Sequence, residues 1–96
     1  FDELFARQVQ ALVNKGDVVI GLSTSGNSEN VVRGLSKARD LGAFTSAMTG
    51  NGGGRLADQT DALIAVPSTD TARIQEMHIL VGHSFCGALE QELGLI

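Results

Sequence analysis

The segment Ser23–Ser28 is the part of this chain whose residue types are best suited to binding an anion. It reads Ser-Thr-Ser-Gly-Asn-Ser, and it lies between an apolar run that ends at Leu22 and a helical pattern. Hydroxyl groups and the unpaired N–H groups of a helix start donate hydrogen bonds to phosphate, and Gly26 lets the backbone approach closely. The segment therefore predicts a phosphate-binding loop. The alternative is a turn that only caps the next helix, because Ser and Asn are common N-caps.

A second glycine-rich segment, Gly50–Gly54, does not predict a nucleotide site. A dinucleotide fingerprint would need a third glycine where this chain has Arg55, and residues 23–28 lack the Gly-Lys-Ser/Thr ending of a Walker loop. We expect residues 50–54 to be a flexible connection between a strand and a helix. We expect no nucleotide cofactor.

Three side chains near the end of the chain could also take part in chemistry. His83 could move protons, because an imidazole titrates near neutral pH; a histidine packed in a helix interface is the alternative. His78 favours a structural or supporting role. Cys86 has apolar neighbours, which favours packing over reactivity, and as the only cysteine it cannot form an internal disulfide, which suits a reducing cytoplasm.

The elements that must position these residues alternate between helix and strand. Apolar residues at helical spacing predict helices over residues 2–14, 28–41, 55–59 and 71–93, with Asp70 or Thr71 as the last N-cap. Apolar runs predict strands over residues 18–22, 44–48 and 62–66. The first strand should be buried on both faces and the second is the weaker candidate. This order specifies an α/β layer with a parallel sheet and right-handed crossovers.

The predicted sheet is small for a stable domain. The 96 residues suffice for one domain but give only three strands, fewer than most sheets have. The chain also opens on a helical pattern without an initiating Met. We therefore expect further strands from an N-terminal segment or from another chain. The last helix is apolar on several sides, which predicts burial in an oligomer interface.

The composition excludes two classes of partner. A net charge of −4, a pI near 4.9 and scattered basic residues argue against a nucleic-acid surface. No apolar stretch approaches the roughly 20 residues that cross a bilayer, and no signal peptide is evident. The sequence therefore predicts a globular domain with neither a nucleic-acid nor a membrane partner.

Three blocks of this sequence together resemble the SIS (sugar isomerase) domain family, in particular its phosphoheptose isomerase branch. The blocks are Gly16–Ser28, Thr49–Gly53 and Ala72–His78, in the family's order, and the resemblance covers essentially residues 1–96. It implies a three-layer α-β-α sandwich with a parallel sheet, of which this chain is the C-terminal part. It also implies a cytoplasmic homotetramer that converts sedoheptulose 7-phosphate to D-glycero-D-manno-heptose 7-phosphate, a lipopolysaccharide precursor.

The resemblance also assigns roles to individual residues. Ser23, Thr24, Ser25 and Ser28 match the family's ligands of the substrate phosphate. Gln75 and His83 match active-site residues that bind zinc in some members, and His83 is one of the acid/base pair. The family's catalytic Glu and a further His ligand lie upstream of the residues present, so this segment alone should be inactive. Ala72 replaces an Asp of some members, and Asn51-Gly52 replaces a Lys-Asp pair.

Two questions stay open: how a zinc ion would be held, and whether the protein is an enzyme or a non-catalytic relative. Gln75 and His83 are separated by a rise of about 12 Å on a straight helix, so they could share one zinc ion only by reaching toward each other or from different protomers. Any zinc ion also needs the ligands that lie outside this segment. Some relatives with the block Arg73–His78 are not isomerases; they bind sugar phosphates as sensors or associate with a replication initiator. His83 favours the enzyme over this alternative.

Overall fold

The computed structural model describes residues 1–96 as three α-helices, one 3₁₀ helix and three strands. Their order is α1 (Leu4–Leu12), β1 (Val18–Leu22), α2 (Glu29–Asp40), β2 (Phe44–Thr49), η1 (Gly54–Asp58), β3 (Ala62–Ala65) and α3 (Thr71–Glu92). The predicted order is confirmed, and element ends differ by no more than two residues. Asp70 is the N-cap of α3, since its carboxylate accepts from the N–H groups of Ala72 and Arg73.

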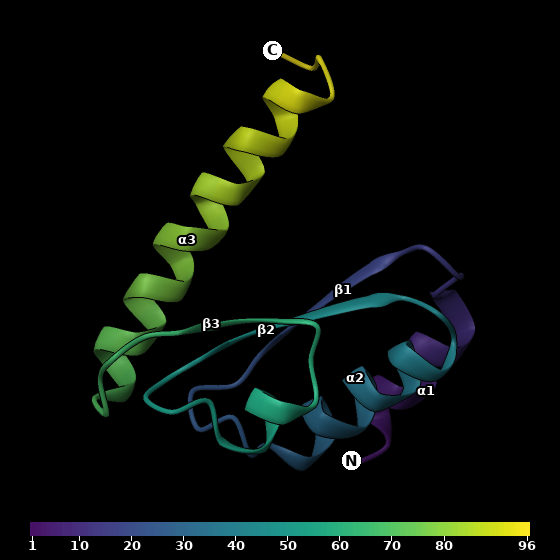
Figure 1. The fold of residues 1–96 in the computed structure, drawn as a ribbon, viewed down its shortest axis with the longest axis horizontal. Helices are drawn as coiled ribbons and strands as arrows, with labels where there is room; N and C mark the ends of the chain where they lie inside the picture. Colours follow the sequence, from purple (N-terminus) through teal and green to yellow (C-terminus); the bar gives the residue numbers. More distant parts are fainter.

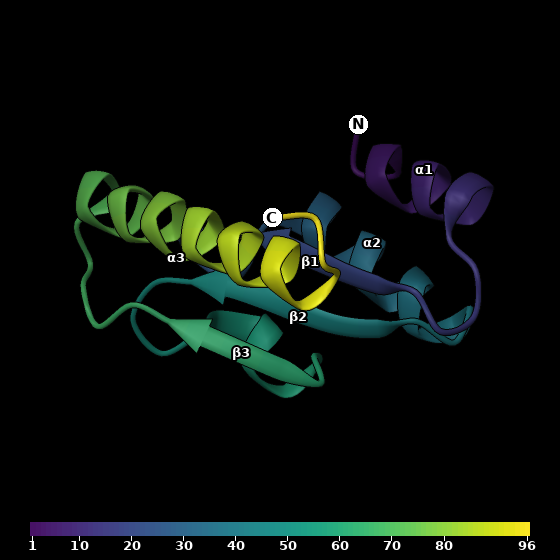
Figure 2. The same cartoon turned by 90° about the horizontal axis from the view of Figure 1, so that it is seen from above.

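The three strands form one parallel sheet with β2 in the centre. Helices α1 and α2 lie on one face of this sheet and α3 lies on the other (Figures 1 and 2). The predicted α-β-α layering is therefore confirmed. No helix combines the length and the apolar composition that crossing a bilayer would require.

The core lies between the sheet and α2, where the buried side chains are Val32, Leu35, Ala47 and Leu56. Gly21 faces this helix from β1. A Cβ atom at Gly21 would lie 2.8 Å from side-chain carbons of Val31 and Leu35, so only glycine allows so close a packing of α2 on β1. The close packing fixes the start of α2 beside the end of β1, where residues 23–28 connect them.

The prediction that β1 is buried on both faces is wrong. Val19 packs against the core, but Val18 and Leu22, which point to the other face, are 59% and 55% exposed. The reason is that β1 is an edge strand and α3 does not cover this part of the sheet. The most enclosed strand is β2, the weaker candidate by sequence.

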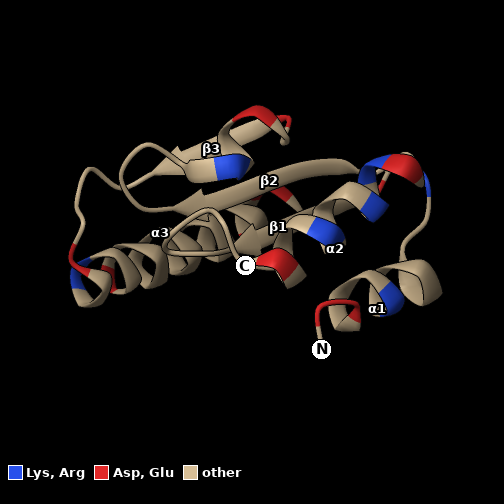
Figure 3. Ribbon diagram, turned by 90° about the horizontal axis from the view of Figure 1, so that it is seen from below, with Lys and Arg blue, Asp and Glu red and all other residues tan.

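Helix α3 packs on the rest of the chain only near its start. Its buried residues are Ile74 and His78, whereas Phe85 and Leu89 are largely exposed. Residues 77–89 contain no Lys, Arg, Asp or Glu, and this part of the ribbon is uncoloured in Figure 3. Cys86 is exposed as well, so the packing predicted for it is not found within this chain. The predicted oligomer interface remains a prediction, and an uncharged helix with exposed apolar side chains is consistent with it.

Asp61 links the start of β3 to the start of β2. One of its carboxylate oxygens accepts from the N–H of Thr45 at 2.8 Å and from the Thr45 hydroxyl at 3.2 Å, and Arg39 lies 3.9 Å from the carboxylate. The pKa of Asp61 is held below its ordinary value, chiefly by the hydrogen bond from the Thr45 backbone N–H. The hydrogen bond from the Thr45 hydroxyl and the charge of Arg39 act in the same direction, and partial desolvation opposes them. A carboxyl whose pKa is lower in the folded state stabilises the fold above its unfolded pKa of about 4. That stabilisation is lost as the pH falls through the pKa that Asp61 has in the folded state.

We expect Asp61→Asn to lower the urea midpoint at neutral pH and to have a much smaller effect at about pH 2, where the wild-type carboxyl is also neutral. Urea unfolding of both proteins at the two pH values measures this. Asp40→Asn is the matched control, since the Asp40 carboxylate makes no ion pair. An equal loss at both pH values would contradict the assignment.

Candidate phosphate-binding site

Three loops follow the carboxyl ends of the three parallel strands and lie at one edge of the sheet. The N–H of Ser23 donates to the Met48 carbonyl at 3.0 Å, and the N–H of Gly50 donates to the Thr24 carbonyl at 2.8 Å. The N–H of Asn51 then donates to the Ser68 carbonyl at 3.1 Å. Each loop is thus hydrogen-bonded to the next. Open α/β sheets bind their ligands at this edge.

The Ser23 hydroxyl organises the loop from inside. Ser23 is 5% exposed, and its Oγ accepts from the N–H groups of Gly26 at 3.1 Å and Ser28 at 3.4 Å. Because both lone pairs are then used, we infer that its own proton is donated to Ser28 Oγ, 2.7 Å away, and not to Ser25 Oγ, which lies farther off at 3.5 Å. The Ser23 hydroxyl is thus hydrogen-bonded within the loop, and its predicted role as a direct phosphate ligand stays a prediction.

This arrangement leaves the other hydroxyl hydrogens of the loop available. Ser28 Oγ accepts from Ser23, so its own proton is free to donate outward. Ser25 Oγ accepts from the N–H of Asn27 at 3.0 Å, which likewise leaves its proton free. The Thr24 hydroxyl makes no hydrogen bond to the chain. Thr24, Ser25 and Ser28 are thus the three residues whose side chains can donate to a ligand.

Four backbone N–H groups of the same region have no acceptor in the chain. They belong to Thr24 and Ser25 in the loop and to Glu29 and Asn30 at the start of α2. Ser28 is the N-cap of α2 but makes no side-chain capping bond, so the alternative of a turn that only caps the helix is not what the structure shows. Unpaired N–H groups at a helix start attract anions through hydrogen bonding and the helix dipole.

A pocket of about 250 Å³ opens beside two of these residues, Thr24 and Ser25. It is lined by residues of all three loops and the start of α3: Thr24, Ser25, Asn51, Ser68, Thr69, Thr71 and Ile74. Its lining is polar apart from Ile74 and includes no charged side chain. An anion in this pocket would be held by neutral donors. The polar residues after β2 and β3 were missed by sequence reasoning, and their position directly after strand ends is the signal that could have found them.

The glycine-rich segment is not the flexible connection that was expected. The N–H of Leu56 donates to the Gly26 carbonyl at 3.1 Å, and the N–H of Arg55 donates to Asn27 Oδ1 at 2.8 Å. A Cβ atom at Gly26 would lie 2.0 Å from the Gly53 carbonyl oxygen. The two glycine-containing loops therefore pack directly against each other, and each determines the shape of the other.

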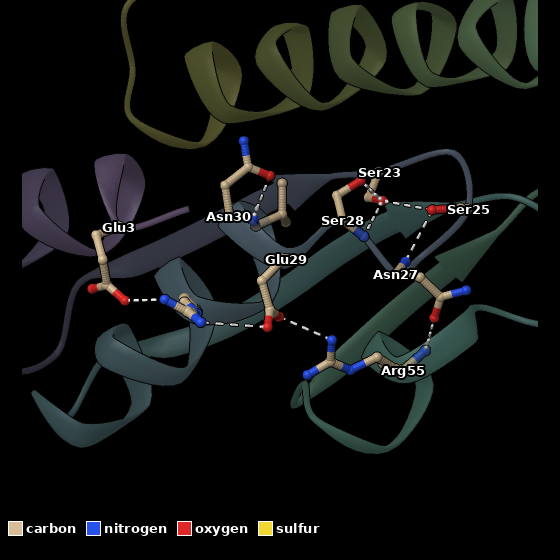
Figure 4. A network of polar contacts seen from close by, with 10 residues as sticks. Glu3, Ser23, Ser25, Asn27, Ser28, Glu29, Asn30 and Arg55 are labelled. Atoms are coloured by element: carbon tan, nitrogen blue, oxygen red, sulfur yellow. Dashed lines mark hydrogen bonds and ion pairs between the residues drawn. The ribbon is translucent and has the colours of Figure 1, made fainter. Parts of the chain in front are cut away.

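An exposed chain of charged side chains runs from α1 to η1 past the loop. Glu3 pairs with Arg33, which lies 3.6 Å from Glu29, and Glu29 accepts from Arg55 Nη1 at 2.9 Å (Figure 4). The carboxylate of Glu29, the first residue of α2, is thus paired with two guanidinium groups. The N–H of Arg55 binds Asn27, so the ion pairs and the loop belong to one network.

Gln75 and His83 lie on α3, and the structure does not bring them to the pocket as a group. Both are exposed, so the alternative of His83 as a packed histidine does not hold within this chain. Thr71 lines the pocket, and the helix rises by about 18 Å from Thr71 to His83 at 1.5 Å per residue. No three His, Cys, Asp or Glu side chains converge. The residues present do not fit a zinc site by themselves.

The comparisons with known proteins agree with this architecture. The SIS domain family matches residues 2–83. The chain is 53% identical over 93 residues to a phosphoheptose isomerase of Aliarcobacter butzleri and 55% identical over 91 residues to one of Aquifex aeolicus, covering 97% and 95% of this chain. A solved phosphoheptose isomerase of Neisseria gonorrhoeae superposes with a TM-score of 0.92 at 44% identity, covering 95% of this chain.

These matches cover only part of each relative. The chain spans 49% and 48% of the two curated relatives and 51% of the solved structure. The extent of the family match and the agreement of fold nevertheless identify the domain. The chain belongs to the SIS domain family.

Proposed function

We propose that the protein carrying this chain is a phosphosugar isomerase that interconverts sedoheptulose 7-phosphate and D-glycero-D-manno-heptose 7-phosphate, and that residues 23–28 hold the substrate phosphate. The observation that carries the proposal is the set of unpaired N–H groups at Thr24, Ser25, Glu29 and Asn30. Two of these residues, Thr24 and Ser25, line a polar pocket, and the relatives that match this chain are named phosphoheptose isomerases.

The loop residues divide into two roles in this proposal. Thr24, Ser25 and Ser28 donate their free hydroxyl hydrogens to the phosphate oxygens. Ser23 fixes the Ser28 hydroxyl and the turn at Gly26, and it contributes through them. Hydrogen bonds to a charged group are worth about 1.5–3 kcal/mol each, so the three hydroxyls supply much of the affinity.

The chemistry requires two proton-transferring groups. Aldose–ketose isomerisation removes a proton from one carbon and returns it to the adjacent carbon through an enediol, while a second group moves a proton between the two oxygens. His83 is one member of this pair, because a neutral imidazole can accept and return a proton near neutral pH. The other member lies outside this chain, so the chain alone should bind substrate and not isomerise it.

The position of His83 favours an active site shared between copies. The rise of about 18 Å from Thr71 to His83 exceeds the length of an extended seven-carbon sugar phosphate held at the loop. His83 would therefore reach a substrate bound to another copy, and the uncharged, exposed part of α3 supplies a surface for that contact. We propose that the copies form a homotetramer and that it works in the cytoplasm, as the resemblance to phosphoheptose isomerases implies. The predicted zinc ion would need ligands that this chain does not contain.

We expect replacement of Ser25 and Ser28 together by Ala to raise the KM for sedoheptulose 7-phosphate by about tenfold or more, because two donors to the phosphate are lost. The kcat should change less, since neither hydroxyl contacts the reacting carbons. Steady-state kinetics of the full-length protein measure both parameters. Ser36→Ala, an exposed serine of α2, is the control. An unchanged KM in the double variant would count against the loop as the phosphate site.

A non-catalytic sugar-phosphate sensor is the second candidate. It is favoured by the location of the proposed phosphate donors, all of which lie within residues 24–30 and so need no contribution from His83. Titration of the full-length protein with sedoheptulose 7-phosphate, followed by NMR analysis of the sugar, distinguishes the two. Binding with slow appearance of the aldose supports the isomerase, and binding without turnover supports the sensor.

A further inference from the structure

The two buried residues of α3 fix the helix on two consecutive residues at the end of β2. Ile74 lies over Gly50, since a Cβ atom at Gly50 would be 2.6 Å from Ile74 Cδ1. His78 follows one helical turn later on the same face, is 4% exposed, and places Nε2 2.9 Å from the Thr49 carbonyl oxygen. All other residues of α3 are at least partly exposed. The placement of this helix on the sheet therefore depends mainly on the burial of Ile74 and on the hydrogen bond of His78.

The direction of that hydrogen bond follows from its partner. A carbonyl oxygen can only accept, so His78 carries its proton on Nε2 and donates it. The same carbonyl also accepts from the N–H of Val66 at 3.0 Å, which uses both of its lone pairs. The carbonyl oxygen of Thr49 thus connects three parts of the fold: β2, to which Thr49 belongs; Val66, which follows β3; and α3, through His78.

This carbonyl group is one residue away from a contact with the proposed phosphate loop. Gly50, the next residue after Thr49, donates its N–H to the Thr24 carbonyl at 2.8 Å. That bond orients the Thr24–Ser25 peptide, whose N–H belongs to the unpaired set beside the pocket. A displacement of Thr49 would therefore move a donor of the phosphate site, and a displacement of α3 would move Gln75 and His83.

We propose that His78 is a positioning residue that sets α3, and with it His83, in a fixed register relative to the phosphate loop. This inference rests on the proposed function: in an active site shared between copies, the placement of α3 within one protomer decides where its His83 meets the substrate held by the other. A leucine at this position would fill similar space and bury more apolar surface, yet it could slide along the sheet. The imidazole instead forms a directional bond with one carbonyl.

The test compares His78→Leu with His78→Gln in the full-length protein. Leu removes the donor without leaving the Thr49 carbonyl unpaired, because Val66 still donates to it, so the variant should fold. We expect kcat/KM for sedoheptulose 7-phosphate to fall by about tenfold to a hundredfold in His78→Leu, the size of effect that a misplacement of about 1 Å produces. His78→Gln, whose amide can donate to the same carbonyl, should recover most of the activity. Far-UV circular dichroism and thermal unfolding serve as the folding control.

The outcomes separate this inference from the proposed function. Wild-type protein that neither binds nor converts the sugar phosphate overturns the proposed function. Wild-type turnover combined with unchanged kinetics in a folded His78→Leu overturns the inference alone. Equal losses in the Leu and Gln variants also overturn it, because shape and not the donor would then matter.

A measurement on the wild-type protein decides the case if His78→Leu does not fold. With ¹⁵N-labelled histidine, the Nε2–H of His78 should give a slowly exchanging NMR signal, and that signal should shift when sedoheptulose 7-phosphate binds at the loop. A signal that is unchanged at saturating sugar phosphate, or a proton on Nδ1, would refute the positioning role.

Discussion

Replacing Gly26 with Ala should nearly abolish binding of the sugar phosphate. Gly26 has a φ of +73°, and an added Cβ atom would lie 2.0 Å from the Gly53 carbonyl oxygen and 2.5 Å from the Gly53 carbonyl carbon. Both are backbone atoms, so the two loops must separate, which displaces the N–H groups of Ser25 and its neighbours. We expect an affinity loss of about a hundredfold, measured by calorimetric titration with sedoheptulose 7-phosphate. The backbone strain alone should cost about 1–3 kcal/mol of stability.

Gly52→Ala is the matched control for this experiment. Gly52 has a φ of +79°, close to that of Gly26, but an added Cβ atom would meet nothing within 4 Å. It should lose about 1–2 kcal/mol of stability through the left-handed backbone and keep the affinity of the wild type. If both variants lost affinity equally, backbone strain rather than contact between the loops would explain the result.

His83→Ala should reduce kcat by about 10²–10⁴-fold and leave sugar-phosphate affinity nearly unchanged. The physical reason is that phosphate binding and proton transfer use different parts of the chain. The donors to the phosphate belong to residues 23–30, whereas His83 is exposed on α3. Because the side chain makes no hydrogen bond within this chain, its removal should not destabilise the fold. Steady-state kinetics together with titration of the inactive variant measure both quantities.

Ser84→Ala controls for effects of substitution in this part of the helix. Ser84 is the exposed neighbour of His83, and its hydroxyl only donates to the Leu80 carbonyl within the helix. Its kinetics should match the wild type. Wild-type turnover in His83→Ala would mean that another group takes this place in the acid/base pair, and loss of affinity without loss of kcat would make His83 a binding residue.

The features that depend on local sequence could be predicted. Helical spacing, the short apolar run at residues 18–22 and the glycine after each helix define the elements, and β1 and α2 enclose the serine-rich loop. The identity of that loop as a donor-rich strand-to-helix junction follows from residue type alone. The roles of its four hydroxyl residues do not, because they depend on which oxygen each proton reaches in three dimensions.

The features that depend on contacts between distant residues could not be predicted. The central strand contains Ser46 and Ala47, which interrupt the apolar pattern and weaken the strand signal, yet it is the most enclosed because it has a neighbour on either side. The strong apolar signal of β1 belongs to an edge strand. Asn27 and Arg55 are 28 positions apart, so their hydrogen bond, which ties the glycine-rich segment to the loop, leaves no local pattern.

The pairing of Glu29 has a consequence for the charge that the loop can tolerate. An acidic residue in the first turn of a helix lowers the positive potential there, and a carboxylate beside a bound dianion would repel it. Arg55 and Arg33 offset this carboxylate from the outer side of the helix. The electrostatic potential at the N-terminus of α2 therefore depends on arginine side chains that need not contact the bound phosphate. This local compensation allows the site to accept a dianion although the net charge of the chain is negative.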